Sequence, residues 1–229
     1  MLRFIKYPVV IVGATIAGYY SGVSASLRRQ HRKAPEEHAA YLEDLPPTLK
    51  PIAEQIDKHP IFQSLKYDSD YRAIIPAHSV PESLRPHMLT ASTLLGPGKI
   101  SVAPMLFLNG SDLVGFYHLG PDLCGHPGIV HGGLLATLLD EGLARCAFQA
   151  LPKHIGVTAR LTLNYKAPTP ADAYVILNAK VDKIEGRKCY VSGTLSTLGT
   201  EKEPSKILVE ADALIIQPKW AAALPPMNP

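Results

Sequence analysis

An α+β fold, in which one antiparallel sheet is covered by one long helix, is predicted by three features of the sequence. Two apolar runs at 100–108 and 113–119 are joined by an Asn-Gly pair, which is a strong signal for a β-hairpin. A helical pattern of small and apolar residues follows at 131–149. Four further segments between 157 and 215 alternate apolar and polar residues, as strands with one covered face do. A single long helix beside a single sheet implies that the helix covers it.

The expected helix and the first of the four strands each have a definable face. In residues 157–165 the alternation predicts one face formed by Val157, Ala159, Leu161, Leu163 and Tyr165, and another formed by Thr158, Arg160, Thr162 and Asn164. The side of the helix that follows the 3.6-residue period, and that we expect against the sheet, consists of Leu135, Leu138, Leu139, Gly142, Leu143 and Cys146.

The chain before residue 96 reads as an extension of this domain. Residues 36–42 and 48–58 are expected to be short helices, the second with Pro51 in its first turn and ended by His59-Pro60. Prolines and glycines predict a loop with at most one helical turn at 74–98. Between these parts, a flap on the main domain is expected from Ile61, Phe62 and Leu65.

Composition places the chain among globular proteins, with 46% hydrophobic and 19% charged residues. Its net charge of +3 comes from the first 35 residues, which hold six basic residues and no acid. The other 17 basic residues face 20 acids, so no broad basic surface points to nucleic acid. Three scattered cysteines form neither a disulfide framework nor a zinc site, and Cys146 and Cys189 are expected to be buried. No metal or other cofactor is implied.

The N-terminus holds an uncharged span of 21 residues that begins with Tyr7 and ends with Leu27. As a helix it would be ~31 Å long, about the thickness of a hydrocarbon core. A membrane anchor, a cleaved mitochondrial import segment and a secretory signal all fit such a span. We therefore divide the chain into an anchor or import segment (1–33), a helical and loop extension (34–95) and the main domain with an irregular tail (96–229). The acid-free start favours a mitochondrial, membrane-anchored protein over one of the endoplasmic reticulum membrane.

The most specific motif lies at the start of the long helix. Residues 125–140 read Gly-His-Pro-Gly-Ile-Val-His-Gly-Gly-Leu-Leu-Ala-Thr-Leu-Leu-Asp. This segment resembles the HGG…D motif of the hotdog-fold acyl-CoA thioesterases, such as the thioesterase-superfamily members and the phenylacetyl-CoA-type enzymes. The resemblance covers residues 99–218 and includes the spacing from His131 to Asp140. It implies a hotdog fold, in which a curled antiparallel sheet wraps round one long central helix.

Thioester hydrolysis needs donors for an oxyanion and a carboxylate that activates water or attacks directly. Gly132 and Gly133 lie in the first helical turn, where N–H groups lack intrahelical partners, and are our candidate oxyanion donors. Asp140, on a stripe of small residues, is the candidate base or nucleophile; the alternative is a solvated surface carboxylate. Glu141 is the rival acid, about 100° round the helix.

The family implies further roles. The donor glycine and the carboxylate come from different subunits of a dimer, so we expect a homodimer or a dimer of dimers. Thr158 occupies the position of a hydroxyl that orients water, unless it is an ordinary strand residue, and His131 is expected to fix the loop rather than act as a base. Relatives often carry Asn where this chain has Gly125, with His126 as a substitute substrate contact. For the CoA phosphates, Arg160 and Lys166 are candidate partners.

These features predict an enzyme that hydrolyses a fatty acyl-CoA to the free acid and CoA. One alternative is a non-catalytic hotdog protein that binds acyl-CoA or serves as an assembly subunit. An enoyl-CoA hydratase of the same fold is a weaker alternative, because its acid five residues before the histidine is replaced here by His126.

Overall fold

A computed structural model describes residues 34–200 and 203–223. Within these residues, seven strands form one antiparallel sheet in the order β1-β2-β3-β7-β8-β9-β6. Their bounds are Arg72–Ile74 (β1), Met105–Asn109 (β2), Asp112–Leu119 (β3), Val157–Tyr165 (β6), Ala173–Glu185 (β7), Lys188–Thr197 (β8) and Ile207–Ile216 (β9).

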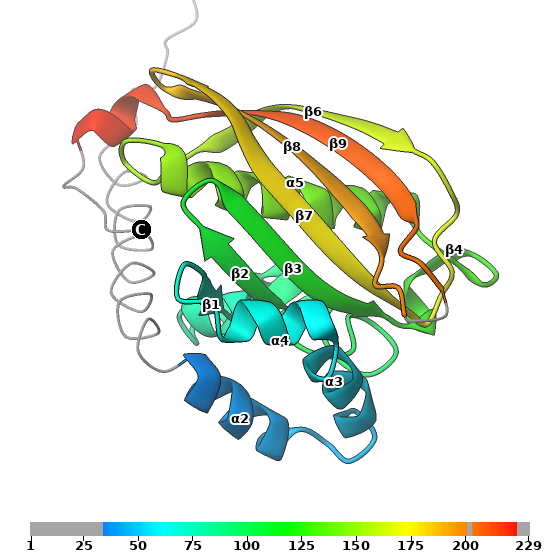
Figure 1. Cartoon of the computed structure of the whole chain (residues 1–229). Helices are drawn as coiled ribbons and strands as arrows, with labels where there is room; N and C mark the ends of the chain where they lie inside the picture. The colour runs from blue at the N-terminus through cyan, green and yellow to red at the C-terminus, as the bar shows by residue number, and fades with distance from the viewer. Residues whose placement is uncertain (1–33, 201–202, 224–229) are drawn as a thin grey trace, which may run out of the picture.

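The long helix α5, Gly132–Ala150, lies inside the curl of this sheet (Figure 1). Its face toward the sheet is the predicted one, and Leu139, Leu143 and Cys146 are completely buried there. On the strands opposite, the inward residues of β7, β8 and β9 complete the same core. The predicted α+β class and hotdog architecture are thus confirmed.

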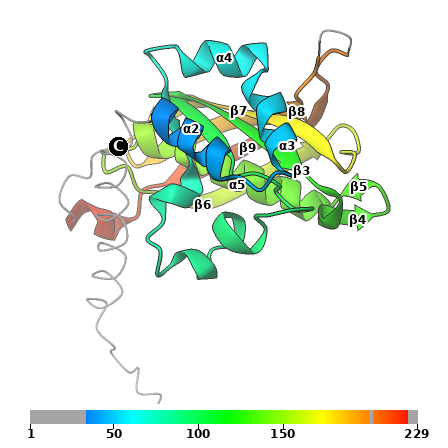
Figure 2. The same ribbon diagram turned by 90° about the horizontal axis from the view of Figure 1, so that it is seen from below.

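The extension covers the other face of the sheet with three helices, α2 (Ala34–Asp44), α3 (Lys50–Asp57) and α4 (Pro60–Lys66) (Figure 2). On α4, Phe62 is fully buried, and its ring centroid lies 5.2 Å from that of Phe107 on β2 and 5.1 Å from that of Phe116 on β3. Leu106 and Leu108 alternate with Phe107 and join the core under α5. Because both faces of β2 are buried, this part of the sheet lies between two cores.

Two parts of the chain differ from the sequence prediction. The strand expected from residue 100 begins only at Met105, because Pro104 has no N–H to donate to a ladder, and Ile100 makes isolated bridges instead. The expected loop at 74–98 contains the last residue of β1 and three short helical turns, Pro76–Ser79, Arg85–His87 and Leu89–Thr93. In the flap region, His59 ends α3 as predicted and also caps α4, because its side chain accepts a hydrogen bond from the Ile61 N–H.

The predicted faces of β6 are partly wrong. A β-bulge lies between Thr158 and Arg160, so one residue is added on β6 without a partner on β9. Thr158 pairs with Ile215 and Leu161 with Ala213, and both partners point into the core under α5. Thr158 therefore lies on the same face as Leu161 rather than on the opposite, polar one.

The expected anchor or import segment, residues 1–33, lies outside the described residues. Within residues 34–200 and 203–223, no helix has both the length and the apolar character needed to cross a membrane.

Candidate active site

The N-terminus of α5 is held by a histidine cap. Residues 120–131 carry a small hairpin of β4 (Cys124–His126) and β5 (Ile129–Val130). His131 follows this hairpin as the N-cap, and its Nδ1 accepts a hydrogen bond of 2.9 Å from the Gly133 N–H. An amide N–H can only donate, so Nδ1 carries no proton in this arrangement. His131 thus caps α5, and the Gly133 amide, one of the two expected oxyanion donors, is already occupied.

Gly132 is the remaining candidate donor. No hydrogen bond from its N–H occurs among the described residues, and its carbonyl accepts one of 2.8 Å from the Tyr165 hydroxyl. A methyl group built on Gly132 would lie 3.4–3.5 Å from the Tyr165 ring, which is ordinary contact. The fold alone does not require a glycine here, whereas a thioester carbonyl approaching the N–H would need the space.

A cavity of about 490 Å³ opens at this end of α5. Its walls are the helix end, the β4–β5 hairpin and the connection from β6 to β7. Five residues that the sequence singles out meet here: Gly125, His126, His131, Gly132 and Lys166. Sequence reasoning missed two further polar lining residues, Tyr165 and Thr169, because they come from a distant strand end and carry no motif.

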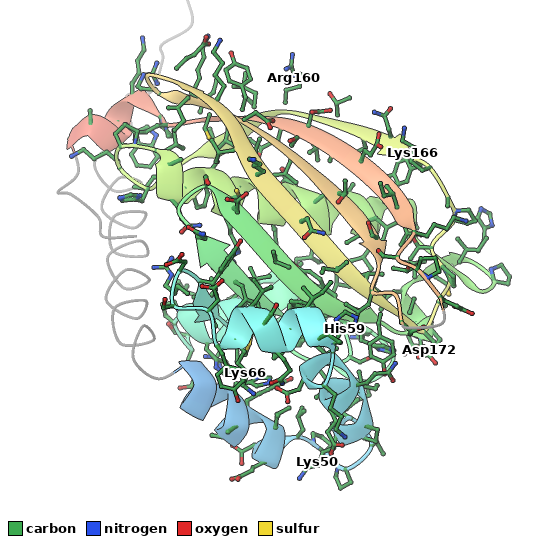
Figure 3. The ribbon with its side chains drawn as sticks, in the orientation of Figure 1. Lys50, His59, Lys66, Arg160, Lys166 and Asp172 are labelled. Atoms are coloured by element: carbon green, nitrogen blue, oxygen red, sulfur yellow. The ribbon has the colours of Figure 1, made fainter. Side chains whose placement is uncertain are left out.

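Other predicted site residues do not line this cavity. Asp140 lies eight residues beyond Gly132 on the same helix, which is ~12 Å along the axis. On β6, Thr158 and Arg160 lie outside the cavity lining as well. Figure 3 shows Arg160 far from Lys166 along β6 and pointing away from the sheet. Within one chain, the candidate donor and the candidate carboxylate therefore lie far apart.

Asp140 and Glu141 have contrasting environments. Both Glu141 carboxylate oxygens accept hydrogen bonds from the Thr90 hydroxyl, at 2.8 and 2.9 Å. In contrast, the Asp140 Oδ1 atom is buried and has no hydrogen-bond partner within the described residues. A buried polar atom without a partner typically costs about 1–3 kcal/mol, so such atoms are rare unless they serve a function.

Two substrate-contact candidates are constrained by their neighbours. The Lys166 ammonium pairs with the Glu210 carboxylate at 2.8 Å on the half-exposed rim. A Cβ on Gly125 would lie 3.0–3.3 Å from three atoms of His131, so a side chain there would press on the cap. The expected substrate contact at position 125 is thus limited to the glycine backbone.

A buried histidine braces the cavity wall from behind. His118, on β3, places its Nδ1 2.9 Å from the Ser101 Oγ and its Nε2 3.3 Å from the Asp172 Oδ1. Burial lowers the pKa of His118, and Asp172 partly opposes that shift. Asp172 ends the β6–β7 connection that lines the cavity, and Figure 3 shows it at the hairpin end of the sheet. Among the described residues, no group of three or more His, Cys, Asp or Glu side chains is placed to hold a metal ion.

Comparison with known proteins agrees with this architecture. The thioesterase superfamily model matches residues 127–203, which include α5 and the cavity-lining connection. A mitochondrial, uncharacterised protein of Candida albicans is 33% identical over 172 residues, covering 74% of this chain and 77% of that protein. MIOREX complex component 3 of Saccharomyces cerevisiae is 32% identical over 192 residues, covering 74% of this chain and 71% of that protein.

A third relative is similar over a shorter stretch of the chain. The acyl-coenzyme A thioesterase THEM4 of Mus musculus is 36% identical over 104 residues, covering 45% of this chain and 42% of that protein. The family model, the long relatives and the hotdog architecture agree with one another. The chain belongs to the thioesterase superfamily.

Proposed function

We propose that this protein hydrolyses a fatty acyl-CoA to the free acid and CoA at a site shared by two copies of the chain. The observation that carries the proposal is the pair of unused groups on α5, the buried Asp140 Oδ1 and the Gly132 N–H. A free carboxylate oxygen and a free helix-end donor are the two parts that thioester hydrolysis requires. The similarity to an acyl-coenzyme A thioesterase supports the same substrate class.

The distance along α5 supports a shared site. Donor and carboxylate would lie ~12 Å apart in one chain, too far to act on one carbonyl group. β6 is an edge strand of the described sheet, with Val157 53% and Tyr165 52% exposed. An open edge of this kind favours pairing with another strand, and pairing with β6 of a second copy would extend the sheet. The second copy would then bring its own α5, and with it Asp140, toward the first cavity.

The chemistry follows from the two groups. The thioester carbonyl oxygen accepts the Gly132 N–H, which stabilises the negative charge that develops on that oxygen. Asp140 of the second copy takes a proton from water as the water oxygen attacks the carbonyl carbon. The carbon–sulfur bond then breaks, and the thiolate of CoA leaves and takes up a proton. Direct attack by the carboxylate, followed by hydrolysis of the resulting anhydride, gives the same products.

A second candidate is a non-catalytic acyl-CoA-binding or assembly subunit. It is favoured by the similarity to MIOREX complex component 3, whose name describes a component of a complex. A mitochondrial location is supported by the mitochondrial relative and by the acid-free basic start of the chain. Membrane attachment through residues 7–27 rests on composition alone.

Mixing two inactive variants tests both the activity and the shared site. In a heterodimer of Asp140→Asn and Gly132→Val chains, one of the two shared sites has both native groups. After random reassociation, we expect about a quarter of the wild-type rate on an acyl-CoA, measured with a thiol reagent. If each site lay within one chain, every site would carry a defect and no rate would return. Wild type that hydrolyses no member of an acyl-CoA panel would favour the non-catalytic candidate.

A further inference from the structure

The cavity at the helix end holds a buried hydroxyl group that the mechanism above does not use. Thr169, on the β6–β7 connection, is 1% exposed and lines the cavity. Its Oγ1 is buried without a hydrogen-bond partner in the described part of the chain. Replacing such a hydroxyl with a methyl group is expected to stabilise a protein, so its presence here calls for a function.

The backbone around Thr169 is held firmly against the β4–β5 hairpin. The Thr169 carbonyl accepts the Val130 N–H at 2.9 Å, and Gly128 accepts the Ala171 N–H at 2.9 Å. Rotation about χ1 is therefore the remaining freedom of the Thr169 side chain, and it exchanges the hydroxyl with the methyl group between staggered positions. Because the whole residue is 1% exposed, rotation alone leaves the hydroxyl covered, and a ligand reaches it when the neighbouring cavity wall moves aside.

The other polar side chains of the cavity are mostly engaged. His131 accepts from the Gly133 N–H, Tyr165 donates to the Gly132 carbonyl and Lys166 pairs with Glu210. Gly125 offers no side chain to a ligand, and a Cβ there would lie 3.0–3.3 Å from atoms of His131. The Thr169 hydroxyl lies in the wall of the same cavity and has no partner in the described residues.

We infer that Thr169 is a substrate-binding residue whose hydroxyl hydrogen-bonds an amide of the pantetheine arm of the acyl-CoA. The inference rests on the proposed function, because it takes the thioester carbonyl to lie at Gly132. Thr169 stands on the β6–β7 wall rather than at the helix end, so its hydroxyl meets the arm that leads away from the thioester. The interaction is the same before and in the transition state, so it lowers KM and leaves kcat nearly unchanged.

The isosteric substitution Thr169→Val tests this assignment with two independent readouts. Loss of an unpartnered hydroxyl should raise the melting temperature by roughly 2–4 °C. Loss of one neutral hydrogen bond should raise KM for an acyl-CoA roughly three- to tenfold, with kcat within about twofold. Thr169→Ser keeps the hydroxyl and should keep the wild-type KM. The S-ethyl thioester of the same acid has no amide, so wild type and Thr169→Val should hydrolyse it equally well.

Other outcomes overturn the inference. A raised melting temperature with unchanged KM would mean that the hydroxyl contacts no substrate. A lowered melting temperature would mean that the hydroxyl has a structural partner. Equal losses on both thioesters would place the effect on the reaction rather than on the arm. If wild type hydrolyses neither thioester, the proposed function fails, and calorimetry with CoA decides separately. A Kd roughly three- to tenfold higher for Thr169→Val would support the inference, whereas an equal Kd or no CoA binding would overturn it.

Discussion

The two flanks of α5 carry neighbouring carboxylates in opposite circumstances. On one flank, residues 76–91 of the extension close a small, largely apolar cavity of about 40 Å³ against the helix, and the Thr90 hydroxyl shares its proton between both oxygens of Glu141. On the other, the Asp140 Oδ1 is buried with no partner in the described residues. Residue type is therefore a poor guide to role along this helix. A carboxylate that accepts hydrogen bonds from its neighbours is the better candidate for a structural role. A buried carboxylate oxygen without a partner costs stability and is the better candidate for a catalytic role.

The largest expected effect comes from Asp140→Asn. The change keeps size and hydrogen-bonding reach but removes basicity and nucleophilicity. We expect kcat for acyl-CoA hydrolysis to fall by roughly 10²–10⁴, the range for losing a positioned base, with KM little changed. Thermal unfolding should show equal or slightly greater stability, because the amide has no buried charge to desolvate.

Glu141→Gln is the matched control for this change. The glutamine carbonyl still accepts a hydrogen bond from Thr90, so most of the wild-type rate should remain. If Glu141→Gln abolished the rate and Asp140→Asn did not, Glu141 rather than Asp140 would be the base.

Periodicity predicted the regular part of the fold well. The face of α5 and the four later strands follow from spacings of 3.6 and 2 residues, which burial on one side imposes, and the hairpin of β2 and β3 follows from two apolar runs joined by Asn-Gly. The bulge in β6 breaks the period by a single residue, so simple alternation placed Thr158 on the wrong face. β1, with three residues, is too short to show any period.

The candidate site was predictable where a motif carries it and not elsewhere. The segment from Gly125 to Gly132 is contiguous in sequence and forms one wall of the cavity. Thr169, from the opposite wall, and Thr90, 51 residues from its partner Glu141, reach their places only through the folded sheet. Contacts between such distant residues leave no local pattern, and the capture of the Gly133 amide by His131 depends on side-chain geometry.

On the extension flank, Thr90→Val should affect stability rather than rate. The substitution removes the hydrogen bond that the Thr90 hydroxyl shares between the two Glu141 oxygens, and water replaces it only in part because the pair is half-buried. We expect the free energy of unfolding to fall by about 1–2 kcal/mol, seen as a lower denaturant midpoint with unchanged slope. The kcat should stay within about twofold, and Thr90→Ser should behave like wild type. A rate loss larger than the stability loss would show that this flank also serves the reaction.

At the cavity end of α5, Tyr165→Phe should lower the rate rather than the stability, and by a smaller factor than Asp140→Asn. The ring keeps its contact with Gly132, but the hydrogen bond to the Gly132 carbonyl is lost, and the helix end that presents the free N–H is held less firmly. Only one neutral hydrogen bond is lost while the ring stays in place, so the free energy of unfolding should change by no more than about 1 kcal/mol. The kcat should fall by roughly two- to fivefold, because the donor spends less time aligned with the oxyanion.

Tyr190→Phe is the matched control for this last change. Its hydroxyl donates to the exposed Glu185 carboxylate, and Tyr190 lies outside the cavity lining, so neither rate nor stability should change measurably. Paired kinetics and denaturant melts of the two variants separate the possibilities. Suppose that Tyr165→Phe lowered the free energy of unfolding by more than about 1 kcal/mol and kept the full rate. The Tyr165 hydroxyl would then have a structural role like that of Thr90, and only Asp140 would distinguish the two sides of α5.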